Sequence, residues 1–120
     1  MIVLDEHLDD PEIRQAIERW YPGKVINIKE ARRKTRILDP ATPSLLQRLK
    51  DPTFVTINWS DFWKKAHPHL AFCIICLKLP LNRVLETPQA LRDVLRKFPT
   101  KRQRMGKILL VGRSEIEIDE

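Results

Sequence analysis

Short apolar runs rich in β-branched residues recur along the chain, and segments with helical spacing separate them. The runs cover residues 2–4, 24–28, 53–57, 71–77 and 107–111. Several lack a polar alternation, which is typical of strands covered on both faces. Three of the intervening segments open with a capping residue followed by proline, the pattern expected at a helix start. These pairs are Asp10-Pro11, Thr42-Pro43 and Thr87-Pro88.

The helical segments predict the fold class. The first carries Ile13, Ile17 and Trp20 at helical spacing and ends before Pro22-Gly23. Two others are expected near residues 43–50 and 88–98, with a short fourth helix at 60–66. Strands that alternate with helices imply a mostly parallel sheet. Residues 115–118 alternate apolar and polar, so we expect an edge strand that forms a C-terminal β-hairpin with residues 107–111.

Length and charge bound the number of domains and the class of partner. The 120 residues suit one α/β domain over 1–120, and the net charge of +6 favours a polyanionic partner. Most basic residues fall into two clusters, which are equally compatible with ordinary solvated faces. The first contains Lys29, Arg32, Arg33, Lys34 and Arg36, and the second contains Arg92, Arg96, Lys97, Lys101, Arg102, Arg104 and Lys107.

Neither a membrane nor a disulfide is expected. No apolar run approaches the ~20 residues of a membrane span, and residues 1–6 lack the features of a signal peptide. We therefore expect a cytoplasmic protein with no membrane partner. Cys73 and Cys76 have the spacing of a redox or zinc pair, but both lie within one apolar run. Positions three apart in a strand face opposite sides, so both are expected in the core.

Acidic and amide side chains follow the predicted strands. Asp5 and Glu6 end the first, Asn58 and Asp61 follow the third, and Asp39 lies before the second Pro-initiated helix. The carboxyl ends of parallel strands meet at one edge, where ligands bind. Oxygen ligands suit Mg²⁺ or Mn²⁺, which can activate water for attack on phosphorus. Alternatively, these acids are exposed residues without a ligand. Asp5 and Glu6 would then end a strand in solvent, Asp39 would end a loop, and Asp61 would lie in the first turn of a helix, where the helix dipole favours a negative charge.

Two segments carry a resemblance to a known family. Residues 2–8, Ile-Val-Leu-Asp-Glu-His-Leu, resemble the Leu-Leu-Asp-Glu-Asn-Leu opening of small PIN-like proteins related to VapC-type toxins and the Mut7-C domain. Residues 54–62 resemble the family's Val-Thr-x-Asp-x-Asp-Phe signature, with one extra residue before Asp61 and with Asn58 where aspartate is usual. The resemblance implies a three-layer domain and a metal-dependent ribonuclease that cleaves single-stranded RNA. It also implies a toxin restrained by a small antitoxin protein, with homodimers common.

The resemblance assigns roles residue by residue. Asp5 and Asp61 would hold Mg²⁺ or Mn²⁺, with Asn58 as a weaker amide ligand. Glu6 and Asp39 would complete the catalytic set, and Thr56 would hydrogen-bond a ligand carboxylate or the RNA phosphate. Residues 100–107 are rich in basic side chains, and we expect the RNA backbone to bind there. The basic residues expected to bind RNA are Lys97, Lys101, Arg102, Arg104 and Lys107.

Three alternatives remain open. The same fold could be a non-catalytic RNA- or protein-binding module, which Asn58 favours because it removes a negative charge. A phosphorelay receiver domain would need an aspartate at the end of the third strand, where this chain has residues Thr56-Ile57-Asn58. Trp59, Phe62 and Trp63 would either stack on bases or pack in the core.

Overall fold

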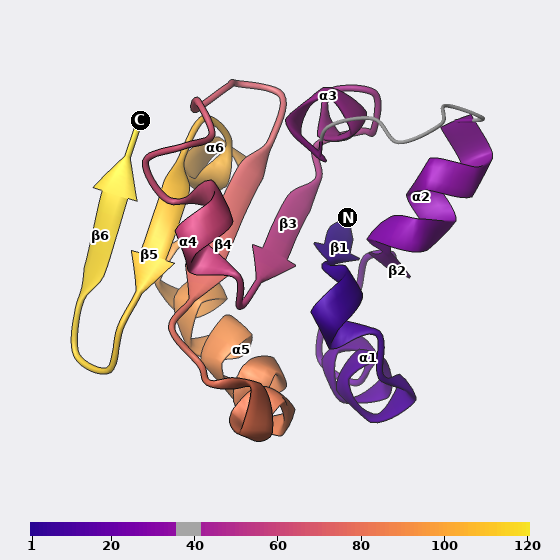
Figure 1. Ribbon diagram of the computed structural model, residues 1–120, viewed down its shortest axis with the longest axis vertical. Coiled ribbons are helices and arrows are strands. Elements are labelled where there is room, and N and C mark those ends of the chain that lie inside the picture. Colours follow the sequence, from indigo (N-terminus) through magenta and orange to yellow (C-terminus); the bar gives the residue numbers. More distant parts are fainter. Residues whose placement is uncertain (36–41) are drawn as a thin grey trace.

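A single mixed sheet organises the chain (Figure 1). The computed structural model describes residues 1–35 and 42–120, without the side chains of residues 33–35. The strand order is β2-β1-β3-β4-β5-β6, with β1 to β5 parallel and β6 antiparallel to β5. The predicted α/β class and C-terminal hairpin are therefore confirmed. The strands are β1 (Ile2–Leu4), β2 (Val25–Asn27), β3 (Thr53–Thr56), β4 (Cys73–Leu77), β5 (Ile108–Val111) and β6 (Ile116–Asp119).

Helices cover both faces of the sheet and complete three layers. Helices α1 and α5 pack on one face, while α2, α3 and α4 pack on the other. Within residues 1–35 and 42–120, no helix is long and apolar enough to cross a membrane. The helices are η1 (Glu6–Leu8), α1 (Pro11–Glu18), α2 (Ile28–Thr35), α3 (Thr42–Leu46), α4 (Trp59–Phe62), η2 (Leu81–Glu86), α5 (Thr87–Lys97) and α6 (Lys101–Arg104).

The two cysteines of β4 illustrate how alternate residues of a strand supply two separate cores. Cys73 packs with the residues under α1 and α5, and Cys76 packs with those under α2, α3 and α4. Both thiols are free and buried, and burial raises the pKa of each to about 12. They are therefore protonated at neutral pH and pack as small hydrophobes. The prediction of a core role is confirmed.

The local sequence signals predicted some of the helices and missed others. Asp10 caps α1 as predicted, its carboxylate accepting a hydrogen bond of 2.8 Å from the backbone N–H of Glu12. Helix α4 ends at Phe62, earlier than predicted, and Lys64 just beyond it has a positive φ of 62°. The pattern of apolar residues did not predict η1, α2, η2 or α6. Helix α6 does have a sequence signal, since Thr100 and Gln103 form a capping box.

The prediction that Thr87 caps a helix is wrong. Thr87 already has helical backbone angles, with φ −53° and ψ −47°, because η2 runs directly into α5. Its N–H donates to the carbonyl of Val84, and its side chain is buried under the helix. Among the residues that the structure describes, the Thr87 hydroxyl has no hydrogen-bond partner. A buried hydroxyl without a partner lowers stability.

We therefore predict that Thr87→Val stabilises the protein by about 1 kcal/mol, because a methyl group of similar size replaces an unpaired hydroxyl. Urea unfolding followed by circular dichroism measures the change. A loss of stability would mean that the hydroxyl has a partner after all, and this account of the α5 start would be wrong.

Candidate active site

The sheet has a topological switch point beside β1. Strand β1 pairs with β2 on one side and with β3 on the other, so the chain changes direction across the sheet there. Ligands of doubly wound sheets bind outside the carboxyl ends of the strands at such a point. Asp5 directly follows β1, and Thr56 is the last residue of β3. We call the edge where β1 to β5 end the carboxyl edge, and the opposite edge the amino edge.

Asp5 is held rigidly at the carboxyl edge. Its backbone N–H donates to the carbonyl of Val55 at 3.0 Å, and its own carbonyl accepts from Asn27 Nδ2 at 3.2 Å. Its carboxylate accepts from the Glu6 N–H at 2.7 Å and from Thr56 Oγ1 at 2.6 Å. The side chain keeps 13% of its surface exposed. Asp5 is thus fixed from both neighbouring strands while its carboxylate still reaches solvent.

A chain of hydrogen bonds joins Asp5 to Asp61. Thr56 Oγ1 donates to Asp5 and accepts from the Asn58 N–H at 2.9 Å. Asn58 Nδ2 then donates to Asp61 Oδ2 at 2.6 Å. The four residues Asp5, Thr56, Asn58 and Asp61 form what we call the acidic rim. The hydrogen bond from Thr56 to the carboxylate of Asp5 is one of the two contacts that the resemblance implied for Thr56.

Asn58 acts as a donor in this arrangement. Its amide nitrogen faces Asp61, and within residues 1–35 and 42–120 its amide oxygen accepts only a long hydrogen bond of 3.4 Å from Ser60 Oγ. The amide therefore offsets the negative charge of Asp61, which an aspartate at this position would instead repel. The expected role of Asn58 as a metal ligand would require the amide to turn away from Asp61.

Of the other predicted acids, the structure describes only Glu6, whose side chain is not part of the acidic rim. Glu6 forms an ion pair with Arg32 of α2, and Asp39 lies outside the described residues. No group of three or more His, Cys, Asp or Glu side chains with metal-binding geometry occurs in the described ranges. Mg²⁺ is nonetheless commonly bound by one or two carboxylates together with substrate phosphates. The oxygen donors of Asp5 and Asp61 fit that chemistry.

Most of the predicted RNA-binding residues lie at the amino edge, away from the acidic rim. Helix α6 directly precedes β5, and Figure 1 shows it where β4 and β5 begin. Lys101 pairs with Asp51 at 3.2 Å, just before β3. A strand of four residues spans ~13 Å, so this segment and Asp5 are separated by about the height of the sheet.

Three of the basic residues have contacts of their own at that edge. Arg104 is only 7% exposed and donates from Nη1 to the Phe98 carbonyl at 2.7 Å. Lys107 donates from Nζ to the Gln103 carbonyl at 2.6 Å. With Lys101 paired to Asp51, these residues stabilise the turns around α6. Arg102 is exposed, and Lys97 at the end of α5 lines a pocket at the carboxyl edge.

Trp59 and Lys78 form a contact beside the acidic rim that the sequence analysis did not predict. Trp59 follows Asn58 directly and is 40% exposed, and Lys78 follows β4. Lys78 Nζ lies 5.1 Å from the centroid of the Trp59 ring, a cation–π contact. Reading the carboxyl end of β4 as well as those of β1 and β3 would have identified Lys78. Phe62 and Trp63 instead pack against the core.

No protein-family model matches the chain, and comparison with curated proteins and with solved structures finds no significant match. The PIN-like resemblance therefore stays a prediction. The function is therefore argued from the geometry of the acidic rim.

We predict that Asn58→Asp destabilises the metal-free protein by about 0.5–1 kcal/mol, because it replaces the donor to the exposed Asp61 with a second carboxylate. Added Mg²⁺ should recover much of this loss by binding the folded state, since ligand charge governs affinity for hard cations. Thermal melts with EDTA and with Mg²⁺ measure both effects.

Asn82→Asp is the matched control, since it adds the same charge at an exposed position on η2. It should change neither the melting temperature nor its dependence on Mg²⁺. If the two variants behave alike, Asn58 does not compensate the charge of Asp61.

Proposed function

We propose that this protein is a metal-dependent ribonuclease of the PIN-like type, which cleaves single-stranded RNA at the acidic rim in the cytoplasm. The observation that supports the proposal best is the hydrogen-bonded chain from Asp5 through Thr56 and Asn58 to Asp61. It lies at the switch point of the sheet, where ligands bind in folds of this kind. Asp5 follows β1 and Asp61 lies in α4 after the adjacent strand β3, in the order that the family resemblance implies.

The two acids of the acidic rim have different roles in this proposal. A Mg²⁺ or Mn²⁺ ion bound there would polarise a water molecule and neutralise charge on the phosphodiester. Asp5, fixed by Thr56 and Asn27, would orient the scissile phosphate through that ion. Asp61 is exposed, and only its Oδ2 is hydrogen-bonded within the described residues. Its Oδ1 would accept the proton that water loses when the water oxygen attacks phosphorus. The P–O bond to the ribose would break at the same time, and the leaving ribose oxygen would take a proton from solvent.

The biological role is proposed from the resemblance alone. Toxins of this type are restrained by a small antitoxin protein and often form homodimers. We propose the same partners for this chain.

A second candidate is a non-catalytic PIN-like module that binds RNA or a protein. Two contacts favour it: Asn58 donates to Asp61, and Glu6 is paired with Arg32. Both pairings satisfy acids without an ion. A binding module should hold RNA equally well in EDTA and in Mg²⁺ and leave it intact, whereas a ribonuclease should degrade it only with the ion.

We predict that Asp5→Asn and Asp61→Asn each lower the rate of RNA cleavage at least ~100-fold, because each removes a charged oxygen needed to hold the ion or accept the proton. Both variants should remain folded. Gel assays with a labelled single-stranded RNA and Mg²⁺, repeated with EDTA, measure the rate.

Asp51→Asn provides a matched control at the amino edge. Asp51 has a positive φ of 48°, which asparagine tolerates, and it contacts Lys101 rather than the acidic rim. Its cleavage rate should equal that of the wild type. Full activity in Asp5→Asn or Asp61→Asn would place the active site elsewhere.

A further inference from the structure

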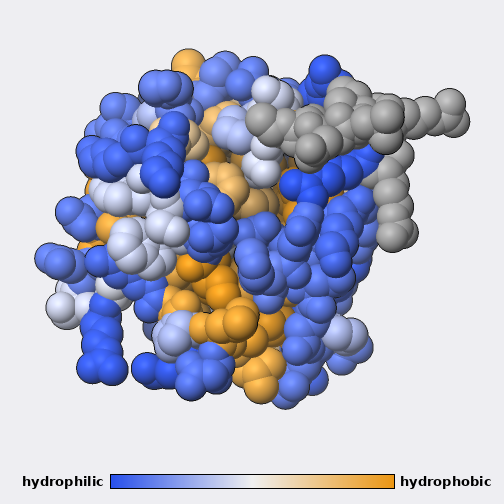
Figure 2. All heavy atoms as spheres, in the orientation of Figure 1, coloured by the Kyte–Doolittle hydropathy of each residue, from blue (hydrophilic) through white to orange (hydrophobic). Residues whose placement is uncertain are grey.

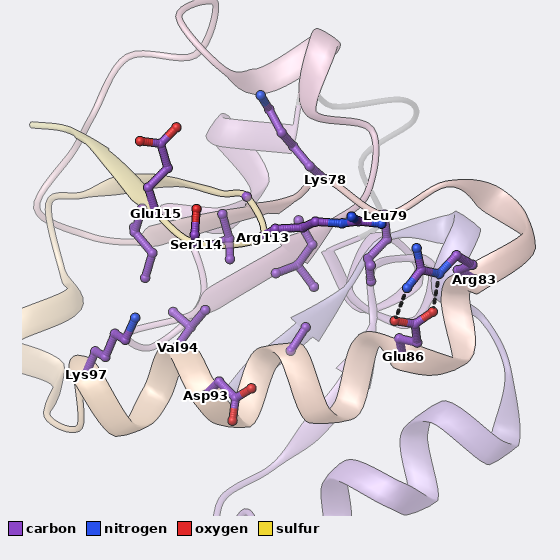
Figure 3. Close-up of a pocket in the computed structure, with 15 residues that line it drawn as sticks. Lys78, Leu79, Arg83, Glu86, Asp93, Val94, Lys97, Arg113, Ser114 and Glu115 are labelled. Carbon is purple, nitrogen blue, oxygen red and sulfur yellow. Dashed lines mark hydrogen bonds and ion pairs between the residues drawn. The ribbon is translucent and has the colours of Figure 1, made fainter.

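A pocket lies at the carboxyl edge beside β4 and β5, one to two strands from β3 and the acidic rim. It has a volume of about 310 Å³ and is enclosed by the ends of β4 and β5, by η2 and α5, and by the turn of the C-terminal hairpin (Figure 3). Leu77, Val94 and Val111 are among its apolar lining residues. Pockets for small ligands measure roughly 300–1,000 Å³, so this one has room for a single small group.

Two charges at one end of the pocket neutralise each other. Arg83 donates to Glu86 from both Nε and Nη2, the latter at 2.8 Å. The pKa of Glu86 is lowered, mainly by the hydrogen bond from Arg83, and Arg113 lowers it further. Arg113 therefore lies close enough to Glu86 for its positive charge to stabilise the carboxylate.

The remaining charges around the pocket are mostly positive. Asp93 accepts a hydrogen bond from Gln89 at 2.9 Å and pairs with Arg96 at 3.7 Å. Apart from Arg83, Glu86 and Asp93, the charged residues that line the pocket are three basic side chains and one acid. The basic ones are Lys78, Lys97 and Arg113, and the acid is Glu115. The pocket therefore suits a ligand that combines an apolar part with a negative charge.

Arg113 is positioned to contact such a ligand. Its side chain extends across the pocket toward Leu79 in Figure 3. It is exposed and makes no hydrogen bond or ion pair with the part of the chain that the structure describes. A planar guanidinium beside an apolar surface is an arrangement on which unstacked nucleobases bind.

Lys78 lies between the pocket and the acidic rim. Lys78 lines the pocket and also contacts Trp59, which is adjacent to Asn58. Figure 2 shows exposed apolar side chains in the lower part of the view, below the ends of β3 and β5. From β3 to β5 the sheet spans two strand spacings, or about 10 Å. A single strand of nucleic acid covers such a distance in a few nucleotides.

We propose that this pocket binds one unstacked base of the single-stranded RNA, with Arg113 against the base and Lys78 near the phosphate that leads to the acidic rim. The inference rests on the proposed function, since it places the pocket on the path of RNA cleaved at Asp5 and Asp61. It also replaces residues 100–107 as the main RNA-binding surface.

Binding of a short, labelled single-stranded oligoribonucleotide in EDTA tests the proposal without cleavage. Arg113→Ala should weaken binding about tenfold, the effect of losing one stacked base. Ala90→Leu should weaken it similarly, because Ala90 lines the pocket and a larger side chain fills it without a change of charge. Arg102→Ala removes an exposed arginine at the amino edge and should leave affinity nearly unchanged.

Small competitors distinguish a base site from a phosphate site. Adenosine monophosphate should displace the oligoribonucleotide, and ribose 5-phosphate, which lacks the base, should not. Wild-type affinity in both Arg113→Ala and Ala90→Leu would overturn the proposal. Equal weakening by Arg102→Ala, or equal displacement by the two competitors, would also overturn it.

The same variants separate this inference from the proposed function. If the wild type binds RNA through the pocket but never cleaves it with Mg²⁺, the ribonuclease is wrong and the pocket stands. If Asp5→Asn abolishes cleavage while Arg113→Ala and Ala90→Leu bind RNA normally, the ribonuclease stands and the pocket is wrong.

Discussion

The parallel pairing of β1 with β3 is the constraint on which the acidic rim depends. Its register places Leu4 opposite Val55, so that Asp5 and Thr56 come next to each other where the two strands end. The 2.6 Å hydrogen bond between their side chains then fixes the carboxylate. A slip of one residue would turn Asp5 or Thr56 to the other face of the sheet. The apolar residues of both strands, buried in two separate cores, prevent that slip.

Asn58 decides the electrostatic character of the acidic rim. As a donor it links the backbone end of β3 to Asp61, and it does so without adding a charge. Two carboxylates in one small region would otherwise repel each other, a cost that an ion or an amide can offset. The Asn58 amide therefore stabilises the folded protein without metal, and the acidic rim needs an ion less than three carboxylates would. This tension separates the ribonuclease from the binding module.

The positive charge of the chain is divided between two edges with different uses. At the amino edge, Lys101, Arg104 and Lys107 bond to neighbouring acidic or carbonyl oxygens and stabilise turns. At the carboxyl edge, Lys78 and Arg113 line the pocket. A net charge of +6 predicts a polyanionic partner in general. Only the position of each basic side chain relative to the strands indicates which surface can bind a polyanionic partner.

Much of the fold follows from local patterns. Apolar runs predicted the strands, helical spacing predicted α1 and α5, and the alternation after Gly112 predicted the hairpin. These signals are local because the period of two or 3.6 residues is a property of the backbone itself. The direction of the chain even implies the amino edge for residues 101–107, which precede a strand. Strand ends likewise predicted that Asp5, Asn58 and Asp61 would meet, but they also predicted Glu6 there, which pairs with Arg32 of α2 instead.

Tertiary structure alone decided which partners the side chains of the site have. Arg32 pairs with Glu6 because α2 packs beside η1, 26 residues away in sequence. Thr87 loses its capping role because η2 continues into α5. The pocket exists only because η2, α5 and the hairpin turn converge at the ends of β4 and β5. Such contacts join segments far apart in the chain, and the packing of whole elements, rather than any local period, determines them.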